Sequence, residues 1–305
     1  MDIRSEAAME LHENPAHPIT PRRGPDFDLD GDIPKYWLDG DAFKSRFFDA
    51  MSILFPEGEK FFITCVRDYR DQVTDPRLQV QVKDFIYQEG QHGMVHSQFN
   101  NRLKRQGIAV DNILERQKGI MFGFFRKYFS RKFTLGQTAA AEHMTALMAH
   151  GFFSKGGLLD NADPRVRAMY AWHAIEEIEH KAVAYDVLKN VAKASYFTRI
   201  LSFMLVTFTF PFHVFMIMRH MFKIDGVKNR LGVWLRGLWW LYGPGGLYMS
   251  LMPHYLAYFV PGFHPWKHGD LNIYQVWVDT YTKTHGDAIA AGDAVGLASR
   301  SAVAA

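Results

Sequence analysis

The 305-residue sequence predicts an all-α protein, in which a helical bundle is followed by a hydrophobic helical extension. Three observations lead to this fold class. Alternating apolar and β-branched runs, which are typical of strands, are scarce between residues 42 and 193. Long segments of that region contain no internal proline. Two of these segments open with Asp-Pro, at Asp75 and Asp163, and an aspartate cap followed by proline is a strong helix start.

Composition limits the class of protein. With 48% hydrophobic and 22% charged residues, the chain can bury a large core, as one large domain or two ordinary ones. The net charge of +3 is too small to indicate a nucleic-acid partner, and we expect none. The single cysteine, Cys65, excludes an internal disulfide framework, and the first 40 residues contain no apolar secretory segment. Both features favour a cytoplasmic location.

The polar, proline-rich residues 1–41 predict an extended arm without a core of its own. Residues 42–194 predict the bundle. Its helices are expected over 57–73, 76–106, 110–130, 134–154 and 164–194. The first helix is expected to start only after Pro56, because proline breaks helices. Thr134 is the expected cap of the fourth helix.

Residues 195–268 predict the hydrophobic extension. Residues 200–218 carry no charge, and 237–266 is a second uncharged stretch that several glycines and prolines interrupt. The first stretch is long enough to cross a bilayer, whereas Pro211 within it argues against a clean span. The sequence leaves open whether this region is a hairpin in contact with the inner membrane or a buried helical pair that forms a substrate lid. Residues 269–305 predict one amphipathic helix and a frayed tail.

An internal repeat carries the candidate chemistry. Fourteen residues after the first Asp-Pro aspartate comes Glu89, and three residues later comes His92. Glu177 and His180 occupy the same offsets after Asp163, the aspartate of the second Asp-Pro pair. Residues i and i+3 lie on one helix face, so each Glu-x-x-His motif presents a carboxylate and an imidazole to one point. Each glutamate lies about 21 Å from its helix start, so the two motifs are expected at matched depth.

Counting back from each helix–helix turn identifies the residues that should face these motifs in antiparallel hairpins. These residues are Glu59 and Glu142. Glu57 is the alternative to Glu59 as the ligand on the first helix, but it lies on the opposite helix face. Glu176 competes with Glu177 because it is one helical turn before the second histidine, but the matched offset favours Glu177. Four carboxylates and two imidazoles at one level of a bundle are the arrangement that holds a dinuclear iron or manganese centre.

Over residues 45–194 the sequence resembles the ferritin-like di-iron carboxylate superfamily. The resemblance rests on Glu59, Glu89-x-x-His92, Glu142 and Glu177-x-x-His180. The segments WHAIEEIEHKAVAYD (172–186) and FPEGE (55–59) resemble a bacterial family labelled predicted metal-dependent hydrolase. The superfamily resemblance implies a ferritin-like four-helix bundle, with bridging and terminal ligand roles for the carboxylates.

A further histidine, His173, lies four residues before Glu177 on the same helix face. The resulting His-x-x-x-Glu-x-x-His pattern is similar to that of the p-aminobenzoate N-oxygenase group of di-iron enzymes, which implies an extra histidine in the ligand set. His173 is expected to be either a metal ligand or a hydrogen-bond donor to one, and His96 is a further candidate. Glu179 is predicted to point away from the site into solvent.

These features favour an enzyme with two iron ions, or iron and manganese, that uses molecular oxygen to oxidise a hydrophobic or lipid-like substrate. The catalytic residues would be the ligands themselves, acting through the metals. No flavin, nicotinamide or iron–sulfur motif is present, so a separate reductase or ferredoxin is expected as electron donor. The alternative is a metal-dependent hydrolase that uses a metal-activated water. Non-enzymatic iron handling ranks third, and a homodimer is compatible with the sequence.

Overall fold

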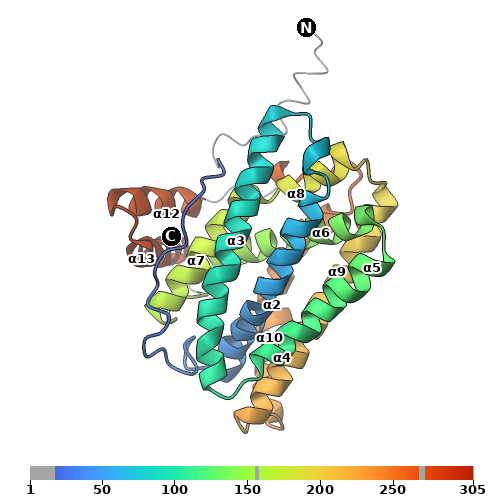
Figure 1. Cartoon of the computed structure of the whole chain (residues 1–305). Coiled ribbons are helices and arrows are strands. Elements are labelled where there is room, and N and C mark those ends of the chain that lie inside the picture. Colours follow the sequence, from blue (N-terminus) through green and yellow to red (C-terminus); the bar gives the residue numbers. More distant parts are fainter. Residues whose placement is uncertain (1–17, 155–157, 268–271, 305) are drawn as a thin grey trace.

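The computed structural model describes residues 18–154, 158–267 and 272–304 (Figure 1). Within these residues the secondary structure is helical, and extended pairing is limited to one bridge between Leu38 and Ala162. The predicted all-α fold is therefore confirmed. Residues 1–17 of the predicted arm lie outside the described residues.

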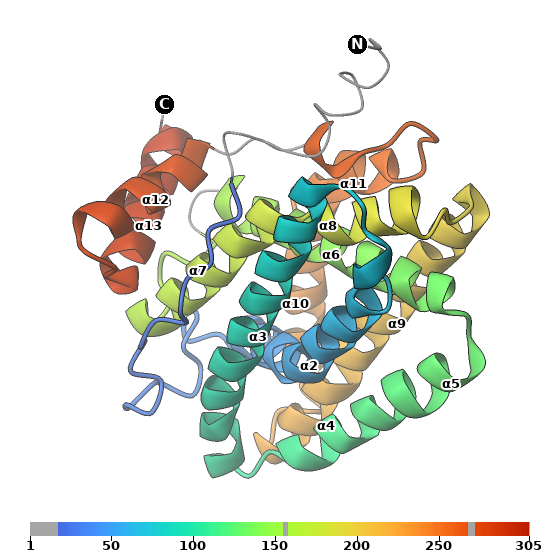
Figure 2. The same cartoon turned by 45° about the horizontal axis from the view of Figure 1, so that its top comes forward.

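Four helices form a closed ring. They are α2 (Ala42–Arg67), α3 (Pro76–Arg105), α6 (Arg131–Ser154) and α7 (Pro164–His180). Helix α2 packs along α3, and α6 packs along α7; α2 also contacts α6, and α3 contacts α7 (Figures 1 and 2). Each helix therefore has two neighbours, and one side of every helix faces a common interior. This arrangement is compatible with the ferritin-like bundle that the sequence predicts.

Helix α2 starts much earlier than predicted. Asp41 caps it by accepting hydrogen bonds from the backbone N–H groups of Phe43 and Lys44, and Pro56 lies within the helix. The prediction that Pro56 prevents an earlier helix is wrong. An internal proline costs about 3 kcal/mol, but the turns before it bury large aromatic side chains, including Phe47 and Phe48, and this burial offsets the cost.

Both Asp-Pro starts are confirmed. Asp75 accepts a hydrogen bond from the N–H of Arg77, and Asp163 caps α7 in the same way. The predicted helix over 164–194 is interrupted after His180, where two turn residues separate α7 from the short helices α8 (Val183–Asp186) and η3 (Val187–Val191).

Helix α6 begins before Thr134. The backbone N–H of Phe133 donates to Ser130 Oγ at 3.2 Å, so Ser130, and not Thr134, is the N-terminal hydrogen-bond acceptor. A serine side chain at this place satisfies one of the free N–H groups of the first turn. The predicted cap was wrong by one helical turn.

The predicted helix over 110–130 is present as a continuous helical segment. It consists of α4 (Val110–Lys118), the π-helical turns of η2 (Gly119–Phe125) and α5 (Arg126–Tyr128). This segment runs antiparallel to α9 (Tyr196–Ile224), as Figure 1 shows. At one end the N–H of Ala109 donates to His220 Nε2 at 3.3 Å, and at the other Ser202 Oγ donates to the carbonyl of Phe133 at 3.2 Å.

The hydrophobic extension consists of α9, α10 (Leu231–Tyr242), α11 (Leu247–Ala257) and the short η4 (Pro265–Lys267). Helix α9 packs against α6 and α2, and α10 also reaches α2. At that contact a Cβ on Gly237 would lie 2.0 Å from the Phe43 ring, so only glycine permits the approach. Among the described helices, α9 is long and apolar enough to cross a membrane by length and composition.

The described part of the N-terminal arm, residues 18–41, contains no helix and is tied to the bundle. Trp37 is buried, and its indole N–H donates to Asp49 at 2.9 Å. The C-terminal region contains two helices, α12 (Asn272–Lys283) and α13 (Ala288–Ala304), where the sequence predicted one and a frayed tail. Both lie beside α7 in Figure 2, and Gly292 allows α13 to approach the backbone of Ala168 closely.

Candidate metal centre

The two Glu-x-x-His motifs meet inside the ring of four helices. His180 Nε2 on α7 lies 3.1 Å from Glu89 Oε1 on α3. His92 Nδ1 on α3 lies 3.7 Å from Glu177 Oε1 on α7. Each histidine is therefore beside the glutamate of the other motif, and all four side chains are buried. The matched offsets in the sequence produce this crossing, because both motifs lie at the same depth from their helix starts.

Glu59 on α2 and Glu142 on α6 complete the cluster. Glu142 Oε2 lies 3.4 Å from His180 Nε2. Glu59 faces α3 at Gly93, where an added Cβ would come within 3.1 Å of Glu59 Oε2, so the glycine leaves room for the carboxylate. Glu57 instead forms an ion pair with Lys60 at 2.7 Å, away from the cluster. The structure thus brings Glu59, and not Glu57, to the predicted place.

Several groups of side chains here have ligand atoms within 4.8 Å of one another, close enough to hold a metal ion. Glu89 belongs to two such groups, one with Glu142 and His180 and one with Glu59 and His92. A carboxylate shared in this way can bridge two adjacent metal ions, and carboxylate with imidazole is a donor set that suits iron or manganese. The six residues predicted as ligands therefore lie together in groups that could hold metal ions.

Buried polar atoms without hydrogen-bond partners point into the cluster. They are both oxygens of Glu59, Glu89 and Glu142, together with His92 Nδ1 and His180 Nε2. Leaving a buried polar group unsatisfied costs about 1–3 kcal/mol, and more for a charged group. Metal ions would satisfy all of these atoms at once, because carboxylate oxygens and unprotonated imidazole nitrogens are metal donors. The residues present fit a metal centre.

The pKa values of the buried carboxyl groups also favour the binding of cations in the cluster. Burial raises the pKa of Glu59 and of Glu142 well above the usual range, and the neighbouring carboxylates raise both further. Burial likewise raises the pKa of Glu89. Burial alone would raise the pKa of Glu177 as well, but the neighbouring imidazoles of His173 and His180 outweigh it, so that pKa is lowered. A cation is what allows so many buried carboxylates to ionise together.

Partners outside the cluster orient both motif histidines. His180 Nδ1 lies 3.0 Å from Gln88 Oε1, and His92 Nε2 lies 3.1 Å from Glu176 Oε2. In each ring the outer nitrogen is engaged, so the inner nitrogen is free for a metal. Burial raises the pKa of Glu176 to about 8, although Arg22 opposes this shift. Glu176, the sequence rival of Glu177, therefore lies behind a ligand and holds His92 in place.

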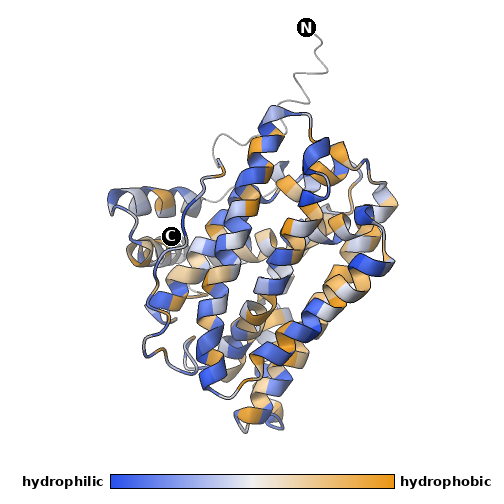
Figure 3. Ribbon diagram, in the orientation of Figure 1, coloured by the Kyte–Doolittle hydropathy of each residue, from blue (hydrophilic) through white to orange (hydrophobic). Residues whose placement is uncertain are grey.

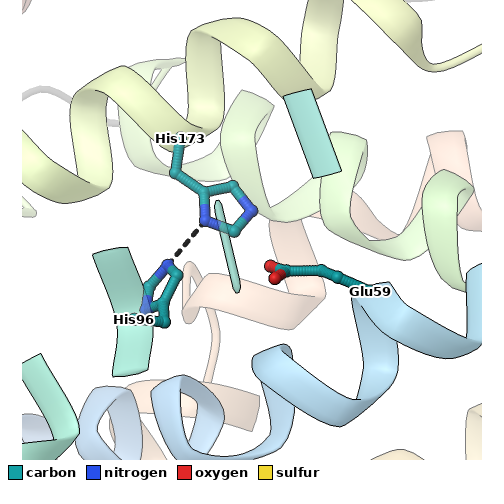
Figure 4. A group of neighbouring side chains, drawn as sticks. All are labelled: Glu59, His96 and His173. Atoms are coloured by element: carbon teal, nitrogen blue, oxygen red, sulfur yellow. Dashed lines mark hydrogen bonds between the residues drawn. The ribbon is translucent and has the colours of Figure 1, made fainter. Parts of the chain in front are cut away.

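Two further histidines extend the cluster (Figure 4). His173 Nε2 lies 2.9 Å from Glu177 Oε1, and His173 Nδ1 lies 2.6 Å from His96 Nε2. His96 Nδ1 in turn lies 2.8 Å from Ser52 Oγ. Figure 4 shows the Glu59 carboxylate directed toward the His173 ring. Both nitrogens of each ring already have partners, so either histidine would exchange a hydrogen bond for a metal bond, and the choice between ligand and donor stays open.

Residues 21–269 match the family described as "Predicted metal-dependent hydrolase". The chain belongs to this family. The match covers most of the chain, including the bundle and α9 to α11, and it confirms the resemblance seen in the motif segments. No curated protein and no solved structure matches the chain. The family description and the buried His/Glu groups both indicate a metal-binding protein.

The prediction for Glu179 is wrong. This family member buries Glu179 completely, where it accepts hydrogen bonds from Arg22 Nη2 at 2.7 Å, Gln88 Nε2 at 2.9 Å and the Tyr274 hydroxyl at 2.8 Å. The N-terminal arm supplies Arg22, and α12 supplies Tyr274. Both segments cover the face of α7 that an isolated four-helix bundle would expose to water. Since Gln88 also contacts His180, Glu179 supports the cluster indirectly.

Replacing Arg22 by alanine is expected to lower the free energy of unfolding by about 3 kcal/mol, because it leaves the buried Glu179 without its cation. Arg22 is itself largely buried and contacts both Glu179 and Glu176. Urea denaturation measures the effect. The neighbouring Arg23, which is exposed, provides the matched control: Arg23→Ala should change stability by less than about 0.5 kcal/mol. Equal effects of the two variants would contradict the role of Arg22.

An apolar cavity of about 130 Å³ leads to the cluster from the side of the hydrophobic extension. It lies between α2, η2, α6 and α9, and Glu59 and Thr145 are part of its wall. Thr145 Oγ1 also donates a hydrogen bond to Glu177 Oε2. The remaining wall is mostly apolar and includes Phe61, Met144, Met148, Val206 and Phe210. The sequence predicted a substrate-binding role for the hydrophobic extension, but it did not indicate that α2, η2 and α6 supply most of the cavity wall.

Proposed function

We propose that the protein is a dinuclear metal enzyme, with two iron ions or iron and manganese, that oxidises a hydrophobic organic substrate with molecular oxygen. The apolar cavity that ends at Glu59 carries this proposal, because it gives a hydrophobic molecule access to the candidate ligands. Bound metals would supply the redox chemistry that protein side chains lack. Electrons would come from a separate reductase or ferredoxin.

The side chains of this protein have distinct tasks in that reaction. The ligands proposed for the metals are Glu59, Glu89, His92, Glu142, Glu177 and His180, with His173 and His96 as further candidates. Gln88 and Glu176 fix the two motif imidazoles through their outer nitrogens. Thr145 fixes one oxygen of Glu177. Since these partners come from rigid helices, the ligands need little rearrangement to bind metal.

The cavity wall binds the substrate and keeps water away from it. Methionine and phenylalanine side chains bind apolar groups without directional contacts, at about 25 cal/mol for each Å² of apolar surface buried. The few polar groups of the wall include Gln137, Thr209 and His213. They can orient one polar group of an otherwise apolar molecule. A hydrophobic, lipid-like or aromatic substrate fits such a wall best.

Hydrolysis is the second candidate, and the family description favours it. Two metal ions can activate a water and stabilise the leaving oxygen of an ester or related bond. The same six ligands would hold the metals, and the same polar wall groups would bind the scissile group. Redox activity of the metals is therefore the property that separates the two candidates.

Metal analysis followed by two assays tests the proposal. Protein purified without added metal should contain about two iron ions, or iron plus manganese, per chain. The chemically reduced protein should then consume oxygen faster when apolar substrates are present. Ester hydrolysis that proceeds without oxygen, in a protein that contains zinc, would replace the proposal by the second candidate. Uptake of iron far beyond two ions per chain would replace it by iron storage.

Filling the cavity is expected to impair substrate binding without loss of metal. Val206 lines the cavity from α9, and tryptophan at this position would occupy much of its volume. For Val206→Trp we expect about a tenfold higher KM for the apolar substrate that supports the fastest oxygen consumption, with unchanged metal content. Val80→Trp, at an exposed position of α3 away from the cavity, is the control. An unchanged KM in both variants would place the substrate elsewhere.

A further inference from the structure

Helix α9 lacks the polar outer face that a surface helix of a soluble protein normally has. Its most apolar 18-residue window has a mean hydropathy of 2.0, yet only 22% of that window is buried. Phe197 is 80% exposed and Phe208 is 67% exposed. Five of its exposed apolar residues form a single stripe, because their spacing of four or seven residues returns to one side of a helix; they are Phe197, Leu201, Phe208, Phe212 and Met216.

The neighbouring η2–α5 segment adds to this surface. It runs antiparallel to α9, and it exposes Phe124, Tyr128 and Phe129. Figure 3 shows hydrophobic colouring along both segments. We call the α9 stripe together with these three aromatic residues the outer apolar face. Exposed apolar patches of this kind mark contacts with proteins or membranes.

The charges around the outer apolar face are basic. Between Glu115 and Glu142 the sequence has six lysines and arginines and no acidic residue, and Asp68 of α2 pairs with only two of the six, Arg126 and Arg131. Between Asp186 and Asp270 the only acidic residue is Asp225, and Arg46 and Lys35 neutralise it at 2.8 Å and 2.6 Å. The chain as a whole is nearly neutral, so this is a local excess of positive charge.

The basic residues also continue the geometry of the stripe. At 100° per residue, Arg219 and Lys223 fall on the same side of α9 as Phe208 and Phe212. Both are exposed. An apolar stripe that passes into lysine and arginine is typical of a helix that lies in the surface of an anionic bilayer.

The cavity lies directly behind this surface. Ile120, Met121 and Phe125 of η2 line it from one side, and Val206 and Phe210 of α9 line it from the other. The same two segments therefore carry the outer apolar face on one side and the cavity wall on the other. A second cavity of about 340 Å³, between α4, η2 and α9, shares Gln117 and His213 with the first. The route to Glu59 thus begins between these segments.

We propose that the outer apolar face docks on a membrane that contains anionic lipid, and that apolar substrate enters the cavity from this membrane between η2 and α9. Docking is independent of the reaction, whereas the entry of substrate rests on the proposed function. A second copy of the chain is a poorer occupant. A symmetric dimer through this face would bring two basic surfaces together, and like charges in contact destabilise an interface.

Vesicle flotation tests docking with the full-length, metal-containing protein. We expect about tenfold more protein bound to vesicles of phosphatidylcholine and phosphatidylglycerol (7:3) than to phosphatidylcholine alone, with a decrease at high salt. The double variant Phe208→Asp/Phe212→Asp should lose this binding at least about tenfold. Val80 is exposed on α3, outside the outer apolar face, so Val80→Asp is the matched control and should bind like the wild type.

Two further measurements separate the alternatives. Arg219→Gln/Lys223→Gln should reduce binding to the anionic vesicles but leave the weak binding to neutral vesicles unchanged. Absence of wild-type binding, or equal binding by the Phe208→Asp/Phe212→Asp variant, would overturn the proposal. A wild-type dimer that this variant converts to a monomer would assign the face to a second copy instead. None of these measurements depends on enzyme turnover. A protein that does not bind vesicles would therefore overturn membrane docking but not the proposed oxygen chemistry, which oxygen consumption tests separately.

Discussion

Replacing Glu89 by glutamine is expected to reduce the metal content by at least about tenfold, from roughly two ions per chain. Glu89 belongs to two of the side-chain groups that could hold a metal, one with Glu142 and His180 and one with Glu59 and His92. Glutamine keeps the size of the side chain but removes its charge and one anionic oxygen. The affinity for metal should therefore fall at both proposed metal positions. Elemental mass spectrometry of protein purified from iron-rich medium measures this directly.

The control for this experiment is Glu57→Gln. Glu57 lies on the same helix as Glu59, two residues before it, but its partner is Lys60 and it takes no part in the cluster. The control should keep full metal content and full oxygen consumption. Because Glu89→Gln removes a buried charge, we expect it to fold, and circular dichroism verifies this. A well-folded Glu89→Gln protein with full metal occupancy would exclude the proposed site.

The position of the cluster could be predicted because helices are regular. A Glu-x-x-His motif at a fixed distance from an Asp-Pro start lies at a fixed depth, whatever packs around the helix. Two copies of this arrangement therefore placed Glu89 and Glu177 side by side. Glu59 and Glu142 followed from counting back through the helix turns, which requires only that the helices are antiparallel neighbours.

The errors arose where distant segments decide the outcome. The burial of Glu179 depends on Arg22 and Tyr274, which are more than 90 residues away in the sequence on either side. The passage of α2 through Pro56 depends on aromatic packing from elsewhere in the fold. Local propensity contains no information on such contacts. The cavity behind η2 and α9 is likewise a property of packing that no sequence periodicity encodes.

The same buried cluster that suits metal should destabilise the protein when metal is absent. Glu59, Glu89 and Glu142 have raised pKa values because burial and the negative charge of neighbouring carboxylates oppose ionisation. Burial lowers the pKa of His180, but the carboxylates of Glu177 and Glu89 outweigh this effect and raise that pKa, so His180 also holds a proton. The folded, metal-free protein thus binds protons at a pH at which the unfolded chain has released them, and folding becomes less favourable as the pH rises.

We therefore expect the metal-free protein to become more stable as the pH falls from about 8, the pKa of Glu176, to 6.5, the ordinary pKa of histidine. Each proton that only the folded state binds over the whole of this range adds about 2 kcal/mol. Below 6.5 the trend should weaken, because burial lowers the pKa values of His92 and His96 and the unfolded chain then binds protons at these residues.

Metal should reverse this dependence. Bound cations keep the carboxylates ionised in the folded state, and protons then compete with the metal for its ligands, so the loaded protein should lose stability as the pH falls. Urea denaturation of both forms at several pH values measures the two slopes. Glu142→Gln removes one of the raised carboxyl groups, so it should flatten the slope of the metal-free protein and raise its stability at pH 8. Parallel slopes for the two forms would mean that the metals bind somewhere other than these carboxylates.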